Sequence, residues 1–182
     1  MTMRTTEELD AGLDHIRGAP ADDGELRLIV RRPAEDERDV VHEAELDLVD
    51  GLVGDNWRTR GNRLTEDGLA HPHAQLTIMS SRVQDVVAGP VENWPPAGDQ
   101  LYVDLDLSED NLPPGTRLAV GGCVVEVTTK PHTGCAKFTR RYGLDAHRWV
   151  NSELGLRLKL RGINAIVVEP GTIRTGDRIK KL

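Results

Sequence analysis

The chain has 182 residues, which is enough for one domain with a hydrophobic core. Its net charge of -7 argues against general nucleic-acid binding, and its two cysteines are too few for a disulfide framework. No apolar stretch approaches the roughly 18 residues that a membrane span needs, and residues 1–17 lack a signal-peptide pattern. We therefore expect a cytoplasmic protein that contacts neither a membrane nor a nucleic acid.

Residues 1–24 are expected to form a short helical extension ahead of a single main domain, residues 25–182. Thr5 and Glu8 form a capping box, in which each side chain bonds the backbone N–H of the other residue. This pattern predicts a short helix that begins after Thr5 and ends near Gly18.

The main domain opens with strand-like alternation. In residues 25–32, Leu26, Leu28 and Val30 alternate with polar residues, so we expect them to share one buried face. Residues 40–49 also alternate and predict a further strand or strand pair.

The middle of the chain has a segment without a regular sequence pattern, followed by segments that predict strands and a helix. Residues 56–72 are polar with no clear period, so they predict a long surface loop. Residues 75–80 predict a strand, 81–88 a helix and 101–107 a half-buried strand.

A hairpin is predicted next. Residues 116–120 and 123–129 are β-rich and are joined through Gly121 and Gly122, a strong turn signal. Cys123 shares a face with the apolar residues of its strand, so it is expected in the core.

The last third combines helices and strands. Residues 137–154 predict one or two helices with a break at Gly143, and residues 162–168 predict a buried strand. Residues 173–180 predict a short hairpin around Gly176. Many short strands, few helices and frequent Pro/Gly turns together favour a mainly β domain, barrel-like, with small peripheral helices.

Cys135 is the residue with the clearest chemical signal. It lies in a Pro/Gly turn, residues 131–135, and not inside an apolar run. Between Thr128 and Arg161 there are eight basic residues and two acidic ones. Positive charge favours the thiolate, the form of cysteine that attacks or binds metal. The segment therefore suggests a reactive thiol beside an anionic ligand, although a solvated basic helix gives the same pattern.

The histidines near this loop leave two alternatives open. His132 lies three residues before Cys135 and is a candidate general base that raises the thiolate content. Together with His71 and His73, the pair also raises a zinc hypothesis, but no Cys-x-x-Cys is present.

Several segments, in order, resemble the MOSC domain, the C-terminal domain of molybdenum cofactor sulfurases. The resemblance spans about residues 25–182. The segments that carry it are residues 51–55, 111–118, 121–128, 131–138, 161–162 and 169–177.

The resemblance implies a β-barrel of the pyruvate-kinase-barrel type and a link to the molybdenum cofactor. It implies that Cys135 ligates molybdenum or carries sulfur. The phosphate of the anionic pterin would then meet basic side chains, for which the candidates are Lys137, Arg140, Arg141 and Arg161. Pyridoxal phosphate, which the parent sulfurases use in a different domain, has no support here.

Three functions remain open at this point. The first is a cofactor-binding protein in oxo- or sulfur-transfer chemistry, either an oxidoreductase for N-oxygenated compounds or a sulfur transferase. An oxidoreductase would need an electron-donor protein, because the chain has no flavin or iron–sulfur motif. The second is a persulfide carrier loaded by a cysteine desulfurase, without bound metal. The third is a non-catalytic interaction module.

Overall fold

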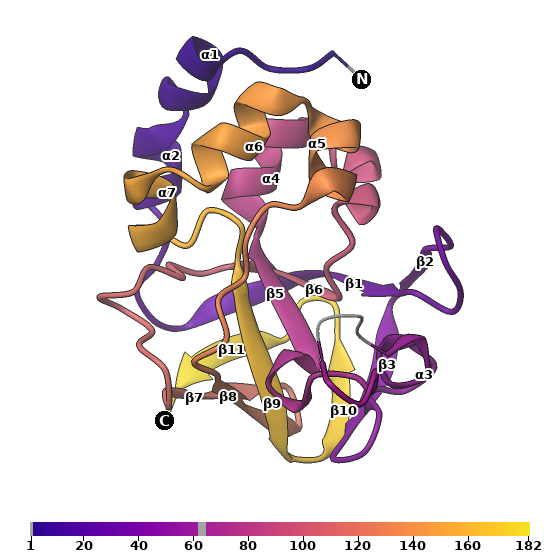
Figure 1. The fold of residues 1–182 in the computed structure, drawn as a ribbon. Coiled ribbons are helices and arrows are strands. Elements are labelled where there is room, and N and C mark those ends of the chain that lie inside the picture. The colour runs from indigo at the N-terminus through magenta and orange to yellow at the C-terminus, as the bar shows by residue number, and fades with distance from the viewer. Residues whose placement is uncertain (1, 62–64) are drawn as a thin grey trace.

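A seven-stranded β-barrel forms the body of the molecule in this computed structural model, which describes residues 2–61 and 65–182 (Figure 1). The strand order is β11-β7-β8-β9-β5-β6-β1, and pairing of β11 with β1 closes the ring. Only β5 and β6 pair in parallel. The barrel strands are β1 (Gly24–Arg31), β5 (Leu76–Ser80), β6 (Leu101–Asp104), β7 (Arg117–Val120), β8 (Cys123–Val127), β9 (Ile163–Glu169) and β11 (Arg178–Lys181).

Four further strands lie outside the ring. β2 (Asp39–Val41) pairs with the end of β1. A separate three-stranded sheet has the order β10-β3-β4, formed by β10 (Gly171–Arg174), β3 (Glu43–Asp47) and β4 (Gly51–Leu52).

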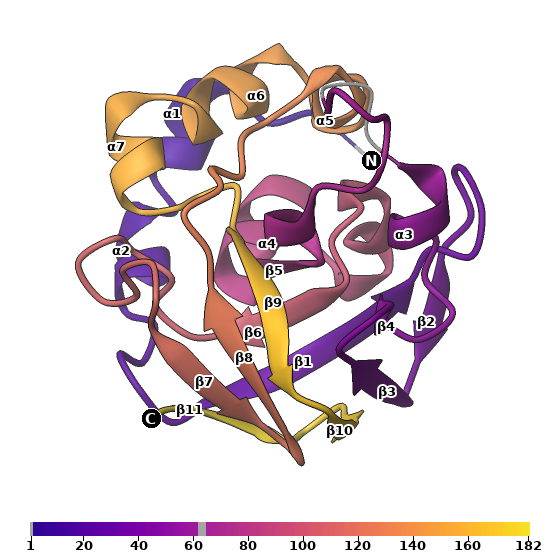
Figure 2. The same ribbon diagram turned by 60° about the horizontal axis from the view of Figure 1, so that its bottom comes forward.

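Most helices gather over one side of the barrel (Figures 1 and 2). α4 connects the parallel strands β5 and β6, as a crossover between parallel strands requires. The α-helices are α1 (Thr6–Asp10), α2 (Leu13–Arg17), α3 (Trp57–Arg60), α4 (Ser81–Ala88), α5 (Ala136–Tyr142), α6 (Leu144–Val150) and α7 (Glu153–Arg157). Single 3-10 turns are η1 (Pro72–Ala74), η2 (Val91–Asn93) and η3 (Pro95–Ala97).

Two apolar cores result from this arrangement. One fills the barrel and includes Leu26, Ile29 and Cys123. The other lies between the barrel wall and the helices and includes Leu28 and Val30. Both faces of β1 are therefore buried.

The expectation that Leu26 shares a face with Leu28 is wrong. A β-bulge shifts the register of β1 against β6 between these residues, which turns Leu26 into the barrel and Leu28 out toward the helices. A bulge adds one residue to a strand, so the period-2 alternation is broken there.

The predicted ends of several elements are confirmed. Thr5 caps α1 through the complete capping box, although a break after Asp10 divides the predicted helix into α1 and α2. Gly143 separates α5 from α6, and the hairpin of β7 and β8 forms as predicted, with Cys123 buried.

Two other expectations need correction. The turn around Gly176 exists, but its strands do not pair with each other, because β10 pairs with β3 while β11 pairs with β1 and β7. The segment 56–72 contains the short helix α3, and its residues 62–64 lie outside the described part.

Membrane-spanning helices were not expected. Among the described residues, no helix has both the length and the apolar character to cross a bilayer.

Candidate functional site

A buried group of charged side chains lies at one end of the barrel. Arg161 Nη1 donates to Asp99 Oδ2 at 2.7 Å, and Arg161 Nη2 donates to the Ala97 carbonyl at 3.1 Å. His132 Nδ1 lies 3.6 Å from Oδ1 of the same carboxylate. The Asp99 side chain is fully buried, and that of His132 is 15% exposed. Asp99 therefore binds a guanidinium through one oxygen and faces an imidazole with the other.

His132 is neutral at physiological pH. Burial, followed by the positive charge of Arg161, lowers the pKa of His132 to about 3, although Asp99 acts in the opposite direction. Three buried atoms of this group have no hydrogen-bond partner within the described part of the chain: His132 Nδ1, Asp99 Oδ1 and Arg161 Nε. Buried polar atoms without partners are costly, so this group has unused capacity for a polar ligand or for water.

A second buried ion pair stands beside the first. Arg32 Nε and Nη2 each donate to one oxygen of Asp55 at 2.8 Å, which is a bidentate contact. Arg32 Nη1 also donates to the carbonyl of Gly98, the residue before Asp99, at 2.7 Å. The two pairs are thus joined through the short segment that precedes β6.

The chain brings these residues together because they flank barrel strands. Arg32 directly follows β1, and Asp99 lies just before the start of β6, which runs antiparallel to β1. Arg161 precedes β9, and His132 follows β8, the antiparallel neighbour of β9. The starts of β6 and β9 both lie beside Ile78 of β5, and this shared register brings the four side chains together.

Two arginines near this end have no ion pair in the described part of the chain. Within the described residues, neither Arg38 nor Arg60 has a carboxylate at ion-pair distance. Burial and the nearby Arg141 and Arg32 lower the pKa of Arg38. The pKa of Arg60 is lowered too, although this residue is exposed. The main cause is loss of solvation by the surrounding protein, and the second is the charge of nearby Arg32. Mutual repulsion of this kind favours an anion at this surface.

Three of the four cations predicted to bind a cofactor already have acidic partners. Lys137 Nζ lies 2.7 Å from Glu35 Oε1, and Arg141 Nη2 lies 2.7 Å from Asp36 Oδ1. Arg161 is buried on Asp99, as described above. Arg140 is exposed and has no ion pair among the described residues.

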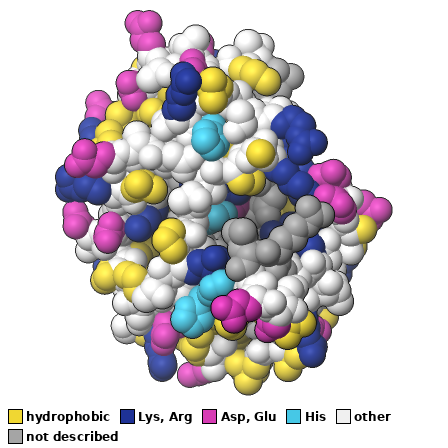
Figure 3. Space-filling model, in the orientation of Figure 1, with side chains coloured by type: hydrophobic (Ala, Val, Ile, Leu, Met, Phe, Trp, Pro, Cys, Tyr) yellow, Lys and Arg dark blue, Asp and Glu magenta, His cyan; other side chains and the backbone are white. Residues whose placement is uncertain are grey.

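Arg140 and Arg141 also border a shallow depression. Its volume is about 280 Å³, and its other lining residues are Asp36, Arg38 and Pro96. On this face, Lys and Arg side chains gather in the region of α5 (Figure 3).

Cys135 is exposed and caps the start of α5 with its backbone. Its loop is fixed to α6 through the preceding glycine: the Gly134 N–H donates to Asn151 Oδ1 at 2.9 Å, and the Gly134 carbonyl lies 3.1 Å from His147 Nε2. A Cβ atom on Gly134 would lie 2.9 Å from both Val150 and Asn151, so only glycine fits there without a shift. The thiol is therefore presented by an anchored loop.

The functional roles predicted for Cys135 and His132 stay predictions. Both residues lie on the loop between β8 and α5, and His132 reaches inward while Cys135 is exposed. The zinc hypothesis receives no support from the geometry, because no three potential metal-ligating side chains group together among residues 2–61 and 65–182.

Sequence reasoning missed Arg32, Asp99 and the ion pair of Asp55. Asp55 follows a glycine in a turn, and its Oδ1 accepts from the backbone N–H of Trp57 at 2.9 Å, as a turn aspartate commonly does. The available signal was a charged residue directly after a buried strand or a glycine turn, as at Arg32, Asp55 and Asp99. Nothing local indicates that such a charge is buried.

Comparison with known families identifies the fold. The model of the MOSC domain matches residues 65–180. The chain belongs to the MOSC domain family. The resemblance seen in the sequence is thereby confirmed, as is the predicted β-barrel with short helices around it. Molybdenum cofactor chemistry is associated with this family and enters here as a proposal.

Solved structures share this MOSC barrel at low sequence identity. The YuaD protein from Bacillus subtilis is 17% identical with a TM-score of 0.61, over 87% of this chain and 94% of that one. YiiM from Escherichia coli is 17% identical with a TM-score of 0.56, over 87% and 69%. YiiM from Geobacillus stearothermophilus is 16% identical with a TM-score of 0.53, over 90% and 74%. A search of curated proteins gives no match.

Proposed function

We propose that this MOSC protein binds the molybdenum cofactor at the barrel end described above, with Cys135 Sγ as the protein ligand of the metal. The observation that carries the proposal is an exposed thiol on the loop of His132, at a surface where Arg38 and Arg60 lack carboxylate partners. A soft thiolate suits molybdenum, and the free positive charge suits the anionic pterin phosphate.

The residues present fit such a group. A metal that arrives inside an organic cofactor brings ligands with it, so one protein thiolate is enough and a cluster of ligating side chains is not required. When bound, the cofactor would supply a metal centre for transfer of oxygen or sulfur atoms.

The basic residues near this site would contribute to cofactor binding in different ways. Arg38, Arg60 and Arg140 are available to attract the phosphate. Lys137 and Arg141 would first have to exchange Glu35 and Asp36 for the ligand. Arg161 stays on Asp99 and contributes mainly its unpartnered Nε–H.

His132 would act as a neutral group. Because its pKa is about 3, the imidazole can donate or accept a hydrogen bond near Cys135 without adding charge. It is therefore better suited to orient a ligand, or to pass a proton, than to stabilise a thiolate by charge.

Two activities follow from this assignment. As an oxidoreductase, the protein would act on N-oxygenated compounds and receive electrons from a partner protein, since its two cysteines cannot hold an iron–sulfur cluster. As a sulfur transferase, it would move sulfur to or from the bound cofactor.

A second candidate is a persulfide carrier without a metal. It is favoured by the pairing of Lys137 and Arg141 with Glu35 and Asp36, which leaves part of the predicted phosphate cradle already occupied. In this case Cys135 would accept sulfur from the persulfide of a cysteine desulfurase, whose own cysteine returns to the thiol.

The deciding measurement is the molybdenum and pterin content of the protein purified anaerobically from a host that makes the cofactor. Cys135→Ala is the test variant, and Cys123→Ala, the buried cysteine, is the matched control. We expect near-stoichiometric molybdenum and pterin in the wild type and in Cys123→Ala, and loss of molybdenum in Cys135→Ala.

Absence of both molybdenum and pterin from the wild type would overturn the cofactor proposal. Mass spectrometry then separates the remaining functions. One added sulfur atom on Cys135, removed by reductant, supports the carrier, while an unmodified thiol under the same loading supports the interaction module.

A further inference from the structure

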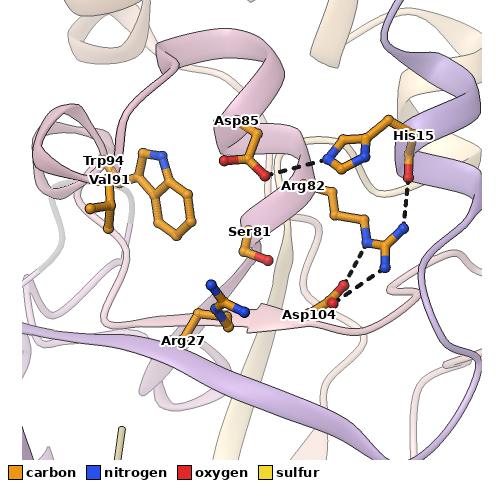
Figure 4. A pocket seen from close by; sticks show the side chains of 8 residues that line it. All are labelled: His15, Arg27, Ser81, Arg82, Asp85, Val91, Trp94 and Asp104. Atoms are coloured by element: carbon orange, nitrogen blue, oxygen red, sulfur yellow. Dashed lines mark hydrogen bonds and ion pairs between the residues drawn. The ribbon is translucent and has the colours of Figure 1, made fainter. Parts of the chain in front are cut away.

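A second pocket lies on the helical side of the barrel, apart from the Cys135 loop. Its volume is about 530 Å³, and its walls come from α2, β1, α4, η2 and β6 (Figure 4). This volume lies within the range of small-molecule sites.

Part of the pocket wall is a fixed frame. Arg82 donates to both oxygens of Asp104, at 2.6 and 3.3 Å, and to the His15 carbonyl at 3.1 Å. The indole N–H of Trp94 donates to the Gly89 carbonyl at 2.9 Å. These polar groups already have hydrogen-bond partners within the protein. They therefore shape the pocket, and other residues must recognise a ligand.

Arg27 supplies a cation that is only loosely paired. It is the residue at the bulge of β1, between Leu26 and Leu28, and bulges redirect side chains. Figure 4 shows its guanidinium pointing up into the pocket toward Ser81. Its ion pair with Glu25 is long, at 3.7 Å, and half of its side chain is exposed.

Ser81 supplies a buried donor next to this cation. It is the first residue of the eight-residue helix α4 and is 4% exposed, yet its hydroxyl has no hydrogen bond to any described residue. No side chain caps this helix start, so the first backbone N–H groups add positive potential. An anionic group is favoured between Ser81 and Arg27.

Asp85 supplies the opposite charge one helical turn further on. Residues four apart on a helix share a face, with Cβ atoms about 6 Å from each other. Asp85 Oδ2 is 3.3 Å from His15 Nε2, while the other oxygen is directed away from His15 and over the pocket (Figure 4).

We propose that this pocket binds a free α-amino acid with an apolar side chain. Its carboxylate would bind Arg27 and Ser81, and its ammonium group would bind Asp85. The carboxylate and the ammonium group of an amino acid are attached to the same carbon atom. With a hydrogen bond at each end, the two groups together can bridge the single helical turn from Ser81 to Asp85. Val91 and the ring of Trp94 line the same pocket and would contact the side chain.

The test is calorimetric titration of the full-length protein with L-phenylalanine and two analogues, 3-phenylpropionate and 2-phenylethylamine, which each lack one charged group. We expect phenylalanine to bind at least about tenfold more tightly than either analogue. Arg27→Gln and Ser81→Ala should weaken phenylalanine and phenylpropionate but leave phenylethylamine unchanged, while Asp85→Asn should weaken phenylalanine and phenylethylamine only.

Cys135→Ala should bind phenylalanine like the wild type, so the result is independent of the cofactor proposal. Arg27 and Asp85 are at the surface, so their variants should fold normally, which thermal unfolding verifies. No binding of phenylalanine up to about 10 mM, or equal binding of all three compounds, would overturn the proposal. Affinities unchanged in all three pocket variants would overturn it as well.

Discussion

Asp99 is an example of how one buried carboxylate determines the state of two neighbours. It forms a buried ion pair with Arg161, and its second oxygen faces the imidazole of His132. Because Arg161 supplies the compensating positive charge, a proton on His132 would add a second buried cation. The imidazole therefore stays neutral.

This neutrality predicts a pH dependence. The folded-state pKa of His132, about 3, is below its usual value of 6.5, so unfolding binds a proton between these values. Stability from this residue is complete above about pH 6.5 and decreases as the pH falls, by on the order of 3 kcal/mol at about pH 4. NMR titration should leave the His132 ring signals unchanged down to about pH 5.

His132→Gln is the matched variant, since glutamine does not titrate. Its free energy of unfolding should fall less steeply than that of the wild type between about pH 6.5 and 4. Protonation of His132 near pH 6.5 in the folded protein would show that the imidazole is not held in this environment.

At the level of elements, two glycines have a similar positive φ but different surroundings. Comparing them distinguishes the cost of backbone strain from the cost of a steric clash. Gly162, at φ +94°, leads into β9, and a Cβ atom there would lie 2.3 Å from the carbonyl oxygen of Ile78 in β5. Gly115, at φ +90°, has open space around the same position. Gly162 directly follows Arg161, which binds the buried Asp99.

These glycines give a paired prediction. Gly115→Ala should cost about 1–2 kcal/mol from its backbone conformation alone. Gly162→Ala should cost clearly more, about 3 kcal/mol or above, because β9 must also move away from β5. Urea denaturation of both variants measures the difference, and equal losses would argue against the close packing of β9 on β5.

The fold of the whole molecule was largely predictable from local patterns. Alternating apolar residues and a glycine turn predict strands such as β7 and β8, and the helical spacing of apolar residues predicts α4. Which strand closes the ring is a long-range property, so the pairing of β11 with β1 could not be predicted from the residues around Gly176.

The site was predictable only at its surface. Cys135 and Arg140 are chemically reactive or charged residue types in an exposed, basic stretch that can be recognised along the sequence. Arg32 and Asp99 lie 67 positions apart and become one network through strand ends. A local sequence pattern cannot predict this contact, because the register of the sheet determines it.

Closure of the ring also gives a prediction. A chain that ends at Asp177 lacks β11 and leaves the edges of β1 and β7 unpaired, so we expect it to aggregate. Lys180→Ala keeps the backbone pairing and should elute at the same volume as the wild type. Size-exclusion chromatography compares the two, and a folded truncation that elutes without aggregates would mean that β11 is dispensable.

The same closure has a consequence for synthesis. A ribosome adding about 5–20 residues per second needs roughly ten to forty seconds to complete these 182 residues. During synthesis one edge of β1 stays unpaired until β6 is made, and the other until β11, the barrel strand furthest along the chain, at residues 178–181. The barrel cannot close before β11 has left the exit tunnel, and chaperones that cover strand edges would act in this interval.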